Sequence, residues 1–315
     1  MGTRRDRPAL LEIVVPAFNE ADRLPAGLDL LCAKLAGLAG LDGRAEVIVV
    51  DNASTDGTAG IVESWDGPVP VRLVRCGRRG KGAAVRAGLL ATKAPYVGFM
   101  DADMATDLAA LDEAIVLLRE GRPVVVGSRR HGRSVVQGYA LPVRRLGAIT
   151  FNRIVRDLVG GIPDTQCGFK FFYGPLGRAA AADLHTAGFS FDVELLAHCV
   201  RRGASVTDIP VVWRDRPGST FSVRRHSLQC LLDLARIRAR AGVRLPVIPV
   251  KPNLPMVPLR AVFGEPSTVP VVLSEPIALS GSVALSGSVG LSGSVGLSNA
   301  AALAENVHTS RAKTG

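Results

Sequence analysis

The chain has 315 residues, 47% apolar and 21% charged, a composition that supports a folded core and excludes wholesale disorder. The formal net charge of +10 favours anionic partners, such as nucleic acid, an anionic membrane surface or phosphorylated substrates. The five cysteines show no C-x-x-C spacing, which disfavours a zinc ribbon, a dithiol redox site and a disulfide framework. The sequence contains no run of about 18 apolar residues, which argues against an integral membrane protein.

The first part of the chain alternates short apolar segments with longer segments of helical spacing. Strands are expected at residues 10–16, 45–50, 69–75, 96–100 and 124–127, and helices between them at 24–38, 56–64, 81–92 and 108–119. This alternation, with continuous Val/Ile-rich strands, predicts an α/β fold with a mostly parallel sheet. Ligands of such sheets bind at the carboxyl ends of the strands.

The regularity weakens after residue 128. Helices are expected at 144–158, 191–202 and 226–241, the first and last with basic faces, and a strand at 205–213. Prolines dominate from Leu245, and residues 279–298 contain three copies of LSGSV. We therefore predict one folded domain over residues 8–244 and a disordered, Pro-rich and low-complexity tail over 245–315.

Polar residues follow three of the predicted strands. Asn19 and Glu20 come after the first strand and could hold a ribose or base, although Asn19 could instead cap a helix. Asp51 ends the second strand, where an unpaired buried carboxylate is costly, so we expect it to point into a site. Asp101 and Asp103 follow the fourth strand and suit Mg²⁺ or Mn²⁺ together with diphosphate oxygens.

Other motifs narrow the choice of function. Arg129 directly follows the fifth strand, in Gly127-Ser128-Arg129. Lys81 lies between two glycines but lacks the full phosphate-loop pattern, and no G-x-G-x-x-G follows the first strand. A P-loop NTPase and a Rossmann dehydrogenase are therefore disfavoured. The histidines show no metal-ligand spacing.

Taken in order, these clusters resemble glycosyltransferase family 2, whose members have the GT-A fold. The resemblance rests on VPAFNE at 15–20, VVDNASTDGT at 49–58, GKGAAVRAG at 80–88, Asp101-Ala102-Asp103 and Gly127-Ser128-Arg129. DTQCGFK at 164–170 and FSFDVELL at 189–196 resemble the dolichyl-phosphate glucosyltransferases and, more loosely, the dolichyl-phosphate mannose synthases.

The resemblance implies a role for each matching residue. Binding of the nucleotide-sugar is implied for Pro16, Ala17, Asn19, Glu20, Asp51, Lys81, Asp101, Gln166 and Lys170. Asp101 and Asp103 would bind Mg²⁺ or Mn²⁺, and Arg129 and Arg145 would hold an acceptor phosphate. Catalytic roles are implied for Asp101, Asp103, Arg129 and Asp164.

The reaction implied is an inverting transfer of glucose or a related hexose from a UDP-linked donor to a polyprenyl or dolichyl phosphate. A lipid phosphate is already ionised at neutral pH, so it needs no general base. A glycan or small-metabolite hydroxyl is the rival acceptor and needs a carboxylate base, for which Asp192 or Asp164 could serve. Nucleic-acid binding and sugar-1-phosphate nucleotidyl transfer lack supporting motifs.

The expected location is cytoplasmic, with peripheral attachment at the cytoplasmic face of a membrane. Between residues 222 and 244, arginines flank a narrow apolar stripe of Leu228, Leu231, Leu232, Ala235 and Ile237. Such a helix suits the surface of an anionic membrane. The alternative is that the stripe packs on the domain.

Overall fold

The computed structural model describes residues 7–138, 155–215, 223–240 and 245–249, and for residues 223–229 and 231 the backbone alone. Seven strands form one sheet in the order β3-β2-β1-β4-β7-β5-β8. Their bounds are β1 Leu11–Ala17, β2 Ala45–Asp51, β3 Val71–Arg75, β4 Tyr96–Met100, β5 Val124–Ser128, β7 Phe169–Tyr173 and β8 Val206–Pro210. Only β7 runs against its neighbours β4 and β5, so the predicted mostly parallel α/β sheet is confirmed.

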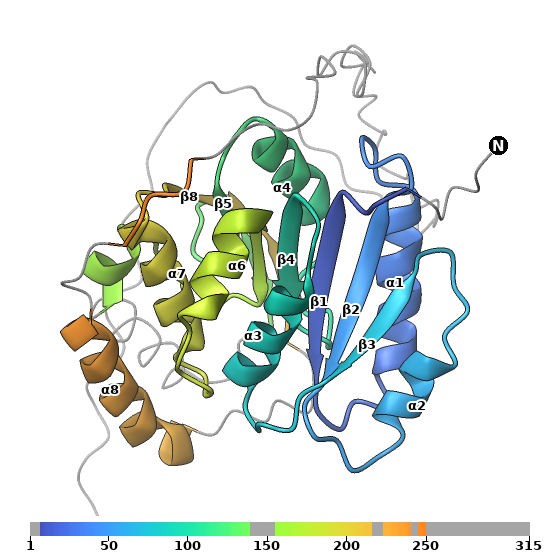
Figure 1. The fold of residues 1–315 in the computed structure, drawn as a ribbon, viewed down its shortest axis with the longest axis horizontal. Helices are drawn as coiled ribbons and strands as arrows, with labels where there is room; N and C mark the ends of the chain where they lie inside the picture. Colours follow the sequence, from blue (N-terminus) through green and yellow to red (C-terminus); the bar gives the residue numbers. More distant parts are fainter. Residues whose placement is uncertain (1–6, 139–154, 216–222, 241–244, 250–315) are drawn as a thin grey trace, which may run out of the picture. The chain divides into compact units, whose positions relative to one another are not determined.

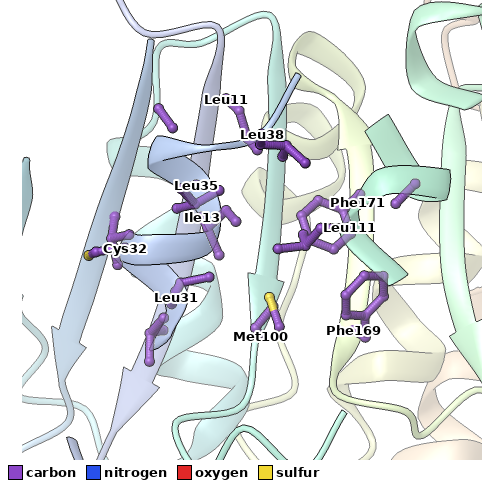
Figure 2. Packing of buried hydrophobic residues seen from close by; sticks show 14 of the residues in the cluster. Leu11, Ile13, Leu31, Cys32, Leu35, Leu38, Met100, Leu111, Phe169 and Phe171 are labelled. Carbon is purple, nitrogen blue, oxygen red and sulfur yellow. The ribbon is translucent and has the colours of Figure 1, made fainter. Parts of the chain in front are cut away.

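Helices cover both faces of this sheet (Figure 1). One face carries α1 (Leu24–Ala36), α2 (Thr58–Glu63) and α4 (Ala110–Arg119), and the other carries α3 (Lys81–Ala91), α6 (Gly174–Ala182) and α7 (Phe191–Arg201). Successive strand residues point to opposite faces, so Ile13 joins the first core cluster and Val14 the second. Figure 2 shows the first cluster, in which Ile13 lies near Leu31 and Leu35 of α1.

The predicted elements of the first part of the chain are confirmed, with ends that differ by at most two residues. Helix α6 was not predicted, nor was the small sheet of β6 (Val135–Gln137) and β9 (Val212–Arg214). The single strand expected at 205–213 is in fact two strands, β8 and β9, which belong to different sheets. The helix expected at 226–241 is present as α8 (Val223–Arg240).

Most of the helix expected at 144–158 lies outside the described residues, and Arg156–Val159 form a 3₁₀ turn. Ile248, just beyond the predicted domain boundary, packs against the second core cluster. The boundary at residue 244 itself stays a prediction. Among the helices that the structure describes, none is long and apolar enough to cross a membrane.

One edge of the sheet brings together the segments that carry the polar motifs. Ala17 and Asp51 are register partners at the ends of β1 and β2. Asp101, just after β4, donates its backbone N–H to the carbonyl of Gly168, just before the antiparallel β7, at 3.1 Å. Because β7 enters the sheet at the edge where its neighbours end, residues 164–168 lie beside the Asp-x-Asp motif.

Candidate active site

Three carboxylates lie close together at this edge, those of Glu20, Asp101 and Asp103. Burial raises the pKa of Asp103, and the negative charge of Asp101 raises it further. Burial also raises the pKa of Glu20. Arg23 lowers that pKa, and the charges of Asp103 and Asp101 raise it further. Mutual repulsion of this kind is relieved by a bound cation.

The Asp101–Asp103 pair fits a divalent cation in its chemistry, since carboxylate oxygens are the ligands that Mg²⁺ and Mn²⁺ prefer. Within the described ranges, no group of three or more His, Cys, Asp and Glu side chains is arranged to hold a metal by itself. A metal here would therefore draw its remaining ligands from water and from a substrate diphosphate, the usual arrangement for Mg²⁺.

Lys81 places a positive charge against these carboxylates. Its Nζ lies 2.5 Å from Oδ1 of Asp101, and it is the first residue of α3. Burial lowers the pKa of Lys81, but the charges of Asp101 and Asp192 outweigh that effect and raise it overall. The ammonium therefore stays charged at neutral pH, at a helix N-terminus that itself favours anions.

The turn before α3 is held by Asn52, a residue to which the sequence analysis gave no role. Its Oδ1 accepts the backbone N–H of Gly80 at 2.7 Å, and its Nδ2 donates to the carbonyl of Arg78 at 2.7 Å. Gly80 has φ +123°, and a Cβ there would lie 2.3 Å from the carbonyl oxygen of Ala187. Asn52 and Gly80 together fix the turn after which α3 begins, at Lys81. The position of Asn52, directly after Asp51 in the family motif, was the available signal.

The loops after β1 and β2 are bonded to each other. Asn19 accepts the backbone N–H of Thr55 at 2.8 Å and donates its own N–H to Oγ of Ser54 at 3.0 Å. Asp51 accepts the backbone N–H of Ser54 at 3.1 Å. The alternative that Asn19 caps a helix is wrong, because α1 begins at Leu24 with Arg23 as its N-cap.

Strained backbone conformations gather at the same edge. Asn19, Ala53 and Met104 have φ values of 53°, 59° and 48°, and each follows a strand that ends there. Left-handed conformations of residues other than glycine are costly and persist where surrounding structure holds them, often at functional sites. Pro16 and Ala17, predicted to line the nucleotide pocket, are the last residues of β1 at this edge.

Arg129 and Asp164 form one unit rather than two separate binding groups. Nε of Arg129 lies 2.7 Å from Oδ2 of Asp164, and Nη2 lies 2.9 Å from Oδ1. The ring of Trp213 lies on the guanidinium, 5.6 Å from Cζ to the ring centroid. Burial raises the pKa of Asp164, but the Arg129 guanidinium outweighs this effect and lowers the pKa to about 2.

Gln166 and Lys170, both predicted to contact the donor, have different surroundings. Gln166 has a buried Nε2 that makes no hydrogen bond within the described residues, which suits a ligand contact. Lys170 is fully buried, and its Nζ lies 2.5 Å from Asp192 and 2.6 Å from the carbonyl oxygen of Cys167. The predicted donor contact of Lys170 needs correction, since its ammonium points into the core. Arg145, the second predicted phosphate ligand, lies outside the described residues.

The comparisons with known proteins agree with this geometry. The sequence profile of the family described as "Glycosyl transferase family 2" matches residues 12–174. This chain belongs to glycosyltransferase family 2. This glycosyltransferase is 32% identical over 243 residues to "Dolichyl-phosphate beta-glucosyltransferase" of Dictyostelium discoideum, covering 73% of this chain and 74% of that protein. It is 34% identical over 251 residues to the protein of the same name in Drosophila melanogaster, covering 75% of this chain and 76% of that protein.

Solved structures support the GT-A-like fold of this glycosyltransferase. The glucosyl-3-phosphoglycerate synthase of Mycobacterium tuberculosis with UDP aligns with a TM-score of 0.54 and 20% identity, over 76% of this chain and 82% of that chain. A second structure of that enzyme, with Mn²⁺ and UDP-glucose, aligns with a TM-score of 0.53 and 19% identity, over 76% of this chain and 81% of that chain. The predicted fold and family are thus confirmed.

Proposed function

We propose that this glycosyltransferase moves glucose or a related hexose from a UDP-linked donor to a polyprenyl or dolichyl phosphate at a membrane surface, with inversion at the anomeric carbon. The names of the relatives support this choice of acceptor and sugar, and the UDP of the structural neighbours supports the donor. Residues 8–244 would form the catalytic domain.

The observation that carries the proposal is the state of the two carboxylates that could serve as a general base. A hydroxyl acceptor must lose its proton to such a base. Asp164 is 1% exposed, is held by Arg129, and with a pKa of about 2 is a poor proton acceptor. Burial raises the pKa of Asp192, but its carboxylate is 3% exposed and is paired with Lys170, so an acceptor hydroxyl does not reach it. A phosphate oxygen is already ionised and needs neither of them.

The donor would bind at the edge where Asp101, Asp103 and Lys81 meet. Asp101 and Asp103 would hold Mg²⁺ or Mn²⁺, which when bound would stabilise the charge of the leaving diphosphate. Lys81 and the N-terminus of α3 would add positive charge there. The nucleotide would lie along the ends of β1 and β2, lined by Pro16, Ala17, Asn19, Glu20 and Asp51.

The acceptor phosphate would lie on the opposite side of the donor sugar, near Arg129. Arg129 already binds Asp164, so we propose that it adds positive charge to this side while it holds the loop before β7. Arg145 stays a predicted second ligand. Attack in line with the bond to the diphosphate would convert an α-linked donor into a β-linked lipid phosphate sugar.

The deciding experiment compares two lipids that differ only in the phosphate. The protein is incubated with Mn²⁺, radiolabelled UDP-glucose and either a polyprenyl phosphate or the matching polyprenol, and label is then extracted into organic solvent. We expect label from the phosphate lipid alone and none with Asp103→Ala. A panel of other UDP- and GDP-sugars tests the choice of sugar. Label that stays in water but moves to a glycan or metabolite hydroxyl would favour the rival acceptor.

A further inference from the structure

A buried ion pair lies in the core beneath the candidate active site. Lys170 of β7 is 0% exposed and Asp192 of α7 is 3% exposed, with Nζ and Oδ1 2.5 Å apart. The ammonium also lies 5.1 Å from the ring centroid of Phe99. Replacing such a pair by apolar side chains is often neutral or stabilising, because both charges lose their hydration when buried. Stability alone therefore does not explain the pair.

Lys170 connects the pair to the loop of residues 164–168. Its Nζ donates to the carbonyl oxygen of Cys167 at 2.6 Å, and the next carbonyl, of Gly168, accepts the backbone N–H of Asp101 at 3.1 Å. Gly168 lies so close that a Cβ there would be 2.1 Å from Cγ of Asp101. A shift of this loop would therefore displace Asp101.

Asp192 connects the pair to α3, the helix that begins with Lys81, through its neighbour Phe191. The neighbouring Phe191 has its ring centroid 6.0 Å from Nζ of Lys81, and a Cβ on Gly82 would lie 2.5 Å from Cβ of Phe191. The first turn of α7 thus packs against the first turn of α3.

We propose that Lys170 and Asp192 are positioning residues for the donor site. Lys170 fixes loop 164–168 against Asp101, and Asp192, in the first turn of α7, holds Lys170 in place beside the helix turn that carries Lys81. Neither residue touches a substrate. The inference rests on the donor site of the proposed function and does not depend on which acceptor is used.

The main test replaces both members of the pair by apolar residues, in Lys170→Met/Asp192→Leu. We expect an unchanged or higher Tm, yet an affinity for UDP with Mn²⁺, measured by calorimetry, that falls at least about tenfold. Hydrogen exchange should become faster at the amides of Asp101 and of residues 166–168, and stay unchanged in β1. The matched control is Leu195→Ala, also in α7 and fully buried, which should lower Tm and change UDP affinity less than about twofold.

The single variants show which member of the pair acts on the loop. Lys170→Met removes the hydrogen bond to the Cys167 carbonyl, so the loop amides should exchange faster and UDP binding should weaken. Asp192→Asn keeps that hydrogen bond, so both effects should be smaller. Each single variant leaves one buried charge unpaired and should be less stable than the double variant, so both are measured well below their Tm.

The outcomes distinguish the positioning role of the pair from the donor site and from the acceptor. If the parent binds UDP and all folded variants bind it equally well, the inference is wrong and the donor site stands. If the parent with Mn²⁺ binds no UDP, the donor site and the inference fail together. UDP binding without transfer to a polyprenyl phosphate contradicts only the proposed acceptor.

Discussion

The guanidinium of Arg129 and the carboxylate of Asp164 meet in a two-point ion pair, with N–O distances of 2.7 and 2.9 Å. The backbone N–H of Arg129 also donates to Oδ2 of Asp164, at 2.9 Å. Arg129 follows β5 and Asp164 precedes β7, so the pair ties together two loops at the same edge of the sheet. Two-point ion pairs of this kind are strong and geometrically specific.

This pair makes folding stability depend on pH in the acid range. The pKa of Asp164 is about 2 in the folded protein, against an ordinary value of 3.8. A lowered pKa contributes stability that is fully present above about pH 4 and is lost as the pH falls toward 2, about 2 kcal/mol in all. Urea unfolding of the parent and of Asp164→Asn should therefore differ most at neutral pH and converge near pH 2. If the free energies of unfolding of the two proteins change in parallel with pH, the pair does not contribute this pH-dependent stability.

Arg129→Lys should separate the acceptor from the donor. Lysine keeps the positive charge but loses the two-point contact to Asp164. We expect the KM for the lipid phosphate to rise several-fold while UDP affinity changes less than about twofold. Arg129→Ala is a poorer choice, because it leaves a buried carboxylate unpaired and should cost about 3–5 kcal/mol of stability. If UDP binding weakens and the KM for the lipid phosphate is unchanged, Arg129 acts on the donor and not on the acceptor.

Asp103→Ala should remove most of the activity if Asp103 holds the metal. We expect a loss of more than about 100-fold in rate, equal to about 2.7 kcal/mol of barrier. The control is Asp112→Ala, which breaks the ion pair between Asp112 of α4 and Lys34 of α1 and should leave the rate unchanged. Transfer should also stop in EDTA and return with Mg²⁺ or Mn²⁺. Full activity in EDTA would remove the metal from the mechanism.

Asn52→Ala should weaken donor binding indirectly, through the turn that positions Lys81. The change removes the hydrogen bonds to Gly80 and Arg78 that fix the turn before Lys81. We expect a loss of about 1–3 kcal/mol of stability and a higher KM for the nucleotide-sugar. Asn52→Asp keeps the acceptor for the Gly80 N–H and should retain more of the affinity. An unchanged KM in Asn52→Ala would show that other contacts hold the turn.

The fifth prediction concerns the binding of helix α8 to an anionic membrane, and the structure changes which residues of the helix face outward. Ile237, which was expected on a membrane-facing stripe, is 4% exposed and packs in the core with Leu234. That part of the prediction is wrong. Leu232 is 46% exposed, and Arg236 and Arg238 are exposed beside it. The helix is thus anchored on the domain and, among the side chains that the structure describes, exposes arginines beside Leu232.

We expect the protein to sediment with anionic but not with neutral vesicles, and to be released near 0.5 M salt, where screening reduces the range of charge to about 4 Å. Arg236→Gln/Arg238→Gln should weaken this binding. Arg75→Gln/Arg122→Gln removes the same amount of charge outside α8 and should weaken the binding less. Binding that ignores lipid charge, or that disappears on removal of residues 250–315, would exclude a role for α8.

The elements of the first part of the chain were predictable because their signals are local. Each strand is a continuous apolar segment and each helix has its own apolar spacing, so neither depends on distant residues. The position of Asp101 and Asp103 directly after a strand was predictable for the same reason. The order of the strands was not predictable, because β7 enters between β4 and β5 from far along the chain.

Lys170 shows where reasoning from the sequence fails. The family motif implied a contact with the donor, but the sequence does not show which way the side chain of this lysine points. Both faces of β7 are buried, because α4 lies on one side and α6 and α7 on the other. The lysine therefore lies in the core and must find a buried partner, Asp192, which is 22 residues away.

The sequence by itself determined the family, the alternation of strands and helices, and the placing of acidic residues at the carboxyl ends of strands, since all three follow from short segments. Only the tertiary structure decided which charges pair. Arg129 with Asp164, Lys81 with Asp101 and Lys170 with Asp192 each join residues at least 20 positions apart. The physical reason is burial. A charge that loses its water must be matched by whatever opposite charge the fold brings within reach, and the sheet topology alone determines which one that is.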